Sequence, residues 1–147
     1  MNYNNKLGIL ILICVMLNNC GYSPIYSSKN IELSINSIEF EKNKLNNKIV
    51  KILKSLSNDN IDLKSDVKIE TIKSKNVLSR SKTGNPEILE LTIQLNIEIN
   101  NDKYEIEQSQ NYKNIENKFE LNQQEDLIEN NLIEKIISKL INNLIVS

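Results

Sequence analysis

The most regular pattern in this chain is an alternation of apolar and polar residues between positions 89 and 99. Every odd position there is Leu or Ile, and the even positions are polar: Glu90, Thr92, Gln94, Asn96 and Glu98. Successive side chains of a β-strand point to opposite faces, so the alternation predicts a strand with one buried face. Its other face must lie in a polar environment.

Three further strands are predicted around this one. Residues 31–35 alternate in the same way, and the phase then slips near Ser37, which indicates a β-bulge or a bend. A second strand begins near Val67 and leads into a hairpin loop over residues 79–86, which contains Gly and Pro. Asn100, Asn101 and Asp102 are typical of a turn, and a fourth strand starts near Tyr104 and fades by Asn114.

Two stretches have the period of an amphipathic helix instead. In the first, Asn43 is a candidate N-cap, and one face carries Leu45, Ile49, Ile52, Leu53 and Leu56. In the second, pairs of Leu and Ile recur about every four residues to the end of the chain. There we predict a helix of about 24 residues from Gln123, long enough to be the main cover of the sheet.

The resulting order is strand, helix, three strands, helix. Loops of hairpin length between the last three strands indicate antiparallel pairing. The simplest packing is an α+β fold with a four-stranded, mainly antiparallel sheet and both helices on its apolar face (order β-α-β-β-β-α). We assign residues 31–147 to this single domain.

The beginning of the chain has the composition of an export signal. Lys6 precedes an apolar run from Leu7 to Leu17, and the chain becomes polar afterwards. A helix over this run is roughly 16 Å long, whereas a bilayer core of about 30 Å requires about 20 residues. We therefore predict a cleaved signal peptide over residues 1–19.

Cys20 stands directly after this segment, with Leu17 three residues before it. That arrangement is typical of lipoprotein signals, in which a peptidase cuts before the cysteine and its thiol carries a diacylglycerol. The alternative is an ordinary signal peptide or a short anchor in which Cys20 is incidental. Residues 20–30 then form an extended tether, because Pro24 opposes a helix.

Composition excludes several classes of function. The 18 basic and 19 acidic residues nearly balance, which argues against general nucleic-acid binding. The chain has no His, and its second cysteine, Cys14, lies inside the signal segment. The usual nucleophile–base pairs and zinc sites therefore cannot be assembled. We expect that the protein is not an enzyme and that it binds no metal and no cofactor. The only attached groups that we expect are acyl chains on Cys20.

The junction Cys20-Gly21-Tyr22-x-Pro24-Ile25-Tyr26 resembles the start of the LPS-assembly lipoprotein family LptE, also called RlpB. That family has the same order of elements at about this length. The resemblance implies an outer-membrane lipoprotein that sits as a plug inside the β-barrel LptD. Such a protein helps the barrel to assemble and helps to insert lipopolysaccharide into the outer leaflet. Gly21 fits sorting to the outer membrane.

Two features of the sequence can be compared with that implied role. The lumen of a barrel is polar, so the polar sheet face could lie within it, or it could simply face water. Around the predicted hairpin, Lys73, Lys75, Arg80 and Lys82 could bind the phosphates of lipopolysaccharide, or be ordinary solvated side chains. The alternative function is a stand-alone periplasmic lipoprotein that binds a protein or an amphipathic ligand.

Overall fold

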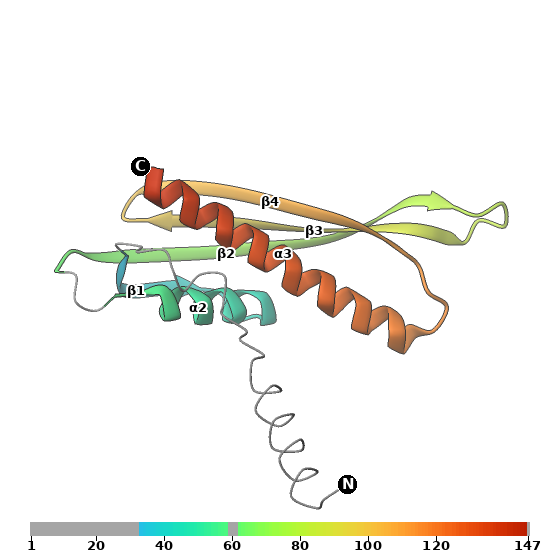
Figure 1. Ribbon diagram of the computed structural model, residues 1–147, viewed down its shortest axis with the longest axis horizontal. Helices are drawn as coiled ribbons and strands as arrows, with labels where there is room; N and C mark the ends of the chain where they lie inside the picture. Colours follow the sequence, from blue (N-terminus) through green and yellow to red (C-terminus); the bar gives the residue numbers. More distant parts are fainter. Residues whose placement is uncertain (1–32, 59–61, 147) are drawn as a thin grey trace, which may run out of the picture.

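The computed structural model describes residues 33–58 and 62–146 (Figure 1). Its elements are β1 (Ser34–Phe40), α2 (Lys44–Leu56), β2 (Lys64–Arg80), β3 (Pro86–Ile99), β4 (Asp102–Lys113) and α3 (Lys118–Val146). The predicted order β-α-β-β-β-α is confirmed. The predicted signal peptide, Cys20 and the tether lie outside the described residues.

The four strands form one sheet in the order β1-β2-β3-β4. β3 pairs antiparallel with both β2 and β4, as the short loops predicted. β1 pairs parallel with β2, because α2 carries the chain back to the edge where β1 began. The register of β1 shifts between Ile35 and Ser37, which confirms the predicted bulge.

The hydrophobic core lies on one face of this sheet. Residues directly opposite each other in an antiparallel pair share a face, so Val67 beside Ile99 and Ile106 beside Leu95 extend the apolar side of β3. Both helices cover that side (Figure 1). The buried core residues of β3 are those of the alternating pattern: Leu89, Leu91, Ile93, Leu95, Ile97 and Ile99.

The start of α2 agrees with its predicted cap. The Oδ1 atom of Asn43 accepts a hydrogen bond of 2.7 Å from the backbone N–H of Asn46. This bond satisfies one of the backbone donors that the first turn of a helix leaves unpaired. The predicted N-cap is therefore confirmed.

The last helix is longer than predicted, since it begins at Lys118 rather than at Gln123. Asn117 explains the difference. Its Oδ1 accepts from the N–H of Phe119 at 3.0 Å, and its Nδ2 donates to Glu120 Oε1 at 3.1 Å. This cap starts the helix before the first regular apolar pair. The 29 residues of α3 span about 43 Å.

The strands are also longer than the apolar pattern indicated. β2 begins at Lys64, three residues before Val67. The turn between β3 and β4 needs only Asn100 and Asn101, which both have positive φ. Asp102, which the sequence placed in the turn, is the first residue of β4. Backbone pairing with β3 therefore extends beyond the residues whose side chains alternate.

Replacing the α2 cap tests this local structure. We expect Asn43→Ala to lower the free energy of unfolding by about 1 kcal/mol, because a backbone donor loses its partner. Asn47→Ala is the matched control, since Asn47 is an exposed residue within the same helix. Urea denaturation followed by circular dichroism measures both. Equal effects of the two substitutions would contradict the capping role.

Candidate functional site

The face of the sheet opposite the helices is a polar surface, which we call the open face. Its clearest feature is a row of alternating charges across all four strands, formed by Glu39, Lys68, Glu98 and Lys103. Lys68 Nζ lies 3.4 Å from Glu39 Oε1, and Lys103 Nζ lies 3.9 Å from Glu98 Oε2. Exposed pairs of this kind contribute little stability. They do keep the face hydrated and free of an apolar patch.

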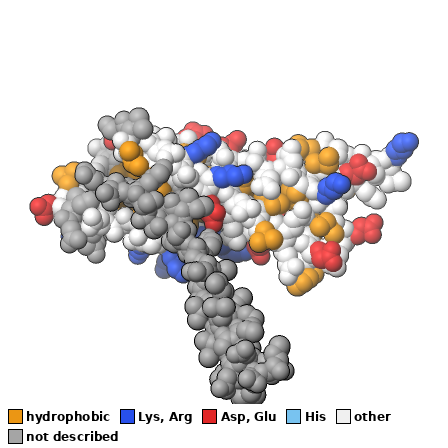
Figure 2. All heavy atoms as spheres, in the orientation of Figure 1, with side chains coloured by type: hydrophobic (Ala, Val, Ile, Leu, Met, Phe, Trp, Pro, Cys, Tyr) orange, Lys and Arg blue, Asp and Glu red, His pale blue; other side chains and the backbone are white. Residues whose placement is uncertain are grey.

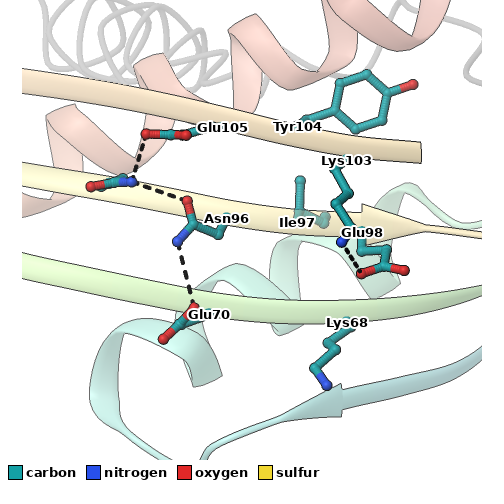
Figure 3. A pocket seen from close by; sticks show the side chains of 9 residues that line it. Lys68, Glu70, Asn96, Ile97, Glu98, Lys103, Tyr104 and Glu105 are labelled. Atoms are coloured by element: carbon teal, nitrogen blue, oxygen red, sulfur yellow. Dashed lines mark hydrogen bonds and ion pairs between the residues drawn. The ribbon is translucent and has the colours of Figure 1, made fainter. Parts of the chain in front are cut away.

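Beside this row, two amides connect three strands. Gln94 Nε2 donates to Asn96 Oδ1 at 3.1 Å and to Glu105 Oε1 at 2.8 Å, and Asn96 Nδ2 donates to Glu70 at 3.5 Å (Figure 3). These side chains line a shallow depression of about 450 Å³. The depression offers donors and acceptors to a polar partner and provides no enclosed apolar pocket.

Two of the predicted ligand-binding lysines lie on the other side of the sheet. Lys73 stands opposite Ile93, and Lys75 stands opposite Leu91, so both point to the face that the helices cover. There Lys73 Nζ reaches Glu129 Oε2 at 2.8 Å. Along β2, both lysines therefore lie on the helix-covered face, beyond the stretch whose apolar side chains fill the core.

Glu129 joins three elements through its carboxylate. The side chain is 2% exposed, and its two oxygens bind Lys48 of α2 at 2.6 Å and Lys73 of β2 at 2.8 Å. Burial alone would raise the pKa of Glu129, but the hydrogen bonds and charges of the two lysines outweigh it and lower that pKa. Glu129 is therefore ionised at neutral pH and fixes α3 to α2 and to the sheet.

A second carboxylate on α3 makes a similar connection. Glu125 Oε1 accepts from Lys75 Nζ at 2.5 Å and from the hydroxyl of Tyr112 at 2.7 Å. Burial, together with the bond to Glu125, raises the pKa of Tyr112 well above its usual range. Lys44 and Asp126 form a third link at 2.8 Å, which is exposed to solvent. Three carboxylates of α3 therefore form four ion pairs along the same side of the helix.

The other two predicted residues, Arg80 and Lys82, lie at the tip of the β2–β3 hairpin, which projects past the helices (Figure 1). Arg80 Nη1 donates to the carbonyl of Gly84 at 3.0 Å. Gly84 has φ +86°, a conformation that suits glycine, and its N–H closes the turn on Ser81 at 2.9 Å. Lys82 is exposed within this turn.

The structure thus separates the four predicted residues into two pairs. Lys75 and Arg80 are five residues apart along β2, a distance of about 16 Å. Lys and Arg side chains are scattered over the surface in Figure 2 rather than gathered in one patch. A ligand at the hairpin tip could meet Arg80 and Lys82, whereas Lys73 and Lys75 are engaged by α3. Binding of lipopolysaccharide stays a prediction.

The sequence did not reveal the residues that connect the helices to the sheet, above all Glu129. One signal was present. Glu129 precedes Leu132, Ile133 and Ile136 by three, four and seven residues, so it occupies the apolar stripe of α3. A charged residue in such a stripe indicates a buried partner. The identity of that partner could not be inferred, since Lys73 is 56 residues away.

Within residues 33–58 and 62–146, no group of three or more His, Cys, Asp and Glu side chains is arranged to hold a metal ion. In the same part of the chain, no helix is long and apolar enough to cross a membrane.

Comparison with known proteins gives a likeness of fold. No protein-family model and no curated protein matches the sequence. An uncharacterized lipoprotein B from Nitrosomonas europaea has 12% identity and a TM-score of 0.55, covering 78% of this chain and 84% of its own. Rare lipoprotein B from Shewanella oneidensis has 15% identity and a TM-score of 0.55, covering 75% of this chain and 97% of its own. At these identities the likeness establishes a common fold.

Glu129 provides a direct test of the helix-side connections. We expect Glu129→Gln to lower the free energy of unfolding by about 1–3 kcal/mol, because two lysines lose a buried, charged acceptor. Asp126→Asn is the matched control on the same helix. Its ion pair with Lys44 is exposed, so we expect a much smaller loss than for Glu129→Gln. Chemical denaturation at pH 7 compares the two variants.

The pH dependence of the Glu129→Gln effect follows from the lowered pKa. The stability that ionised Glu129 contributes is complete above the ordinary glutamate pKa of about 4.3. It is lost as the pH falls through the lower pKa of the folded state. The difference in unfolding free energy between wild type and variant should therefore be constant at pH 6–8 and shrink below about pH 4. A difference that grows on acidification would contradict this account.

Proposed function

We propose that this chain is a lipoprotein of the LptE (RlpB) type, anchored to the outer membrane through acylated Cys20. In this proposal the folded domain, which is not an enzyme, occupies the lumen of an LptD-like β-barrel. It supports the assembly of that barrel and the insertion of lipopolysaccharide into the outer leaflet. The hairpin tip contributes by holding lipopolysaccharide transiently.

The shared fold is the observation that carries this proposal. Two structures of proteins described as lipoprotein B have the same fold over about three quarters of this chain. The name lipoprotein B belongs to those two proteins, and its extension to this chain is an analogy that rests on the shared fold. The junction from Cys20 to Tyr26 adds independent support, because a lipoprotein requires a cysteine directly after its signal segment.

The open face supports the position inside a barrel. Barrel lumens are polar, so a plug must present polar side chains that remain satisfied when water is displaced. The charged row and the network of Gln94, Asn96 and Glu105 have that property. Of the exposed large hydrophobic residues, Ile72 and Ile88 point to this face, and they are well separated along the strands. The face is therefore suited to a wet interface.

The alternative function is a stand-alone periplasmic lipoprotein that binds a protein or an amphipathic ligand. Exposed Val77 and Leu78 near the hairpin tip favour that alternative, since they offer apolar contacts outside the core. The two functions differ in partner: a large membrane barrel in one case, and a soluble protein or small ligand in the other.

Acylation and partnership can be measured together. Palmitate labelling should modify the wild-type chain and be lost in Cys20→Ala, because the thiol is the attachment point. Purification in mild detergent should recover one large barrel protein in a ratio of about one to one, as a plug requires. Recovery of the chain alone, or with a soluble partner, favours the alternative. If wild-type Cys20 carries no label, the proposed lipid anchor is wrong.

The hairpin is tested by reversing its charge. Arg80→Glu combined with Lys82→Glu should weaken binding to lipopolysaccharide by about tenfold or more, because cations that pair with phosphate become anions. Lys135→Glu combined with Lys139→Glu makes the same change of charge on the exposed side of α3 and is the matched control. Affinity is measured with immobilised lipopolysaccharide. Similar losses in both double variants would indicate a general charge effect and not a site.

A further inference from the structure

The two edges of the sheet differ in how they are protected. Along the outer side of β1, the backbone N–H of Asn58 donates to the carbonyl of Leu33 at 2.8 Å. The N–H of Ile35 donates to Ser57 Oγ at 3.1 Å, and the bulge follows directly. Covered backbone groups and bulges are common means of preventing a sheet edge from pairing with another chain. The β1 edge is therefore closed at its start.

The opposite edge, formed by β4, has a different character. β4 pairs with β3 without any shift of register from Asp102 to Lys113, and it is the last strand of the sheet. It contains no proline, and residues 108–112 carry no charge. Among the described residues no strand pairs with its outer side. A long, regular edge of this kind presents unpaired backbone groups to an added strand.

The charges and the length of β4 together favour a second copy of the same strand in one register. When two copies of β4 pair antiparallel about a two-fold axis through Ser109, Glu105 of one copy lies opposite Lys113 of the other, and this happens twice. In the same register Glu107 faces Asn111, and all of these residues are exposed on the open face. Opposite charges across a strand pair stabilise it, and like charges destabilise it.

Neighbouring registers are less favourable. An axis through Gln108 places Lys103 opposite Lys113, which are both cations. An axis through Glu107 places that residue opposite itself. An axis through Gln110 also places Glu107 opposite Lys113, but it shortens the ladder to seven residues and leaves Glu105 without a facing residue in the strand. The axis through Ser109 gives nine paired residues, a length of about 30 Å, with no facing like charges.

We infer that β4 is a self-association edge, at which two copies of this chain join their sheets into one through antiparallel β4–β4 pairing centred on Ser109. The inference depends on the edge and its charges and does not rest on the proposed function. It describes the protein when no other partner covers β4. The charged residues at the two ends, together with the length of the ladder, then fix the register, while the uncharged middle provides backbone pairing.

A single cysteine tests the position of the axis. In Ser109→Cys the two thiols face each other, and facing residues of an antiparallel pair have Cα atoms about 4.5–5.5 Å apart, within the range for a disulfide. In Asn111→Cys the two cysteines are displaced by four residues, about 13 Å, and should not react. The acylated full chain is purified in mild detergent, free of other proteins, and treated with an oxidant. We expect a covalent dimer for Ser109→Cys alone, and none for wild type.

Charge reversal tests the register independently. In the Ser109→Cys background, Glu105→Lys or Lys113→Glu should each weaken association by about tenfold, because attraction at both ends becomes repulsion. The double variant Glu105→Lys with Lys113→Glu should restore cross-linking. A thermal melt confirms that each variant is folded. Equal cross-linking at 109 and 111, or no dimer at either position, would overturn self-pairing.

Discussion

The packing of α3 on the apolar face of β3 is the interaction on which the rest of this structure depends. Six alternating Leu and Ile residues of β3 are buried, and α3 supplies seven further buried apolar residues from Ile128 to Ile141. Each such side chain contributes about 1.5–3 kcal/mol when it is removed from water. No disulfide is available to the described residues, which contain no cysteine, so this contact must provide most of the stability.

One consequence is that the sheet is covered on a single side. Beyond the apolar residues of β2, Lys73 and Lys75 lie on the same face of the sheet. They form ion pairs with Glu129 and Glu125 of α3, respectively. These ion pairs extend the contact of α3 beyond the hydrophobic core and bring in α2 through Lys48. The opposite face keeps its charges and amides free of any described helix. The molecule therefore has one side that holds it together and another that can meet a polar partner.

The sequence predicted the fold best where a pattern was local. The alternation along β3, the bulge near Ser37 and the cap at Asn43 each depend on neighbouring residues, and the structure confirms them. The start of α3 was missed, because its first turn is stabilised by the polar cap at Asn117 rather than by apolar spacing. The partners of Glu129 could not be predicted, because they depend on a register between strands and helices that are far apart in the sequence.

The proposed role as a plug predicts that the open face lies close to the wall of a barrel, which can be tested directly. Ser74 is an exposed, uncharged residue of β2 in the middle of that face, opposite Thr92. A photoreactive amino acid placed at Ser74 in living cells should cross-link the chain to one large outer-membrane protein, since a plug brings this face close to the barrel wall. Cross-linking to soluble periplasmic proteins alone, or no cross-link at all from a folded and acylated chain, would contradict the account.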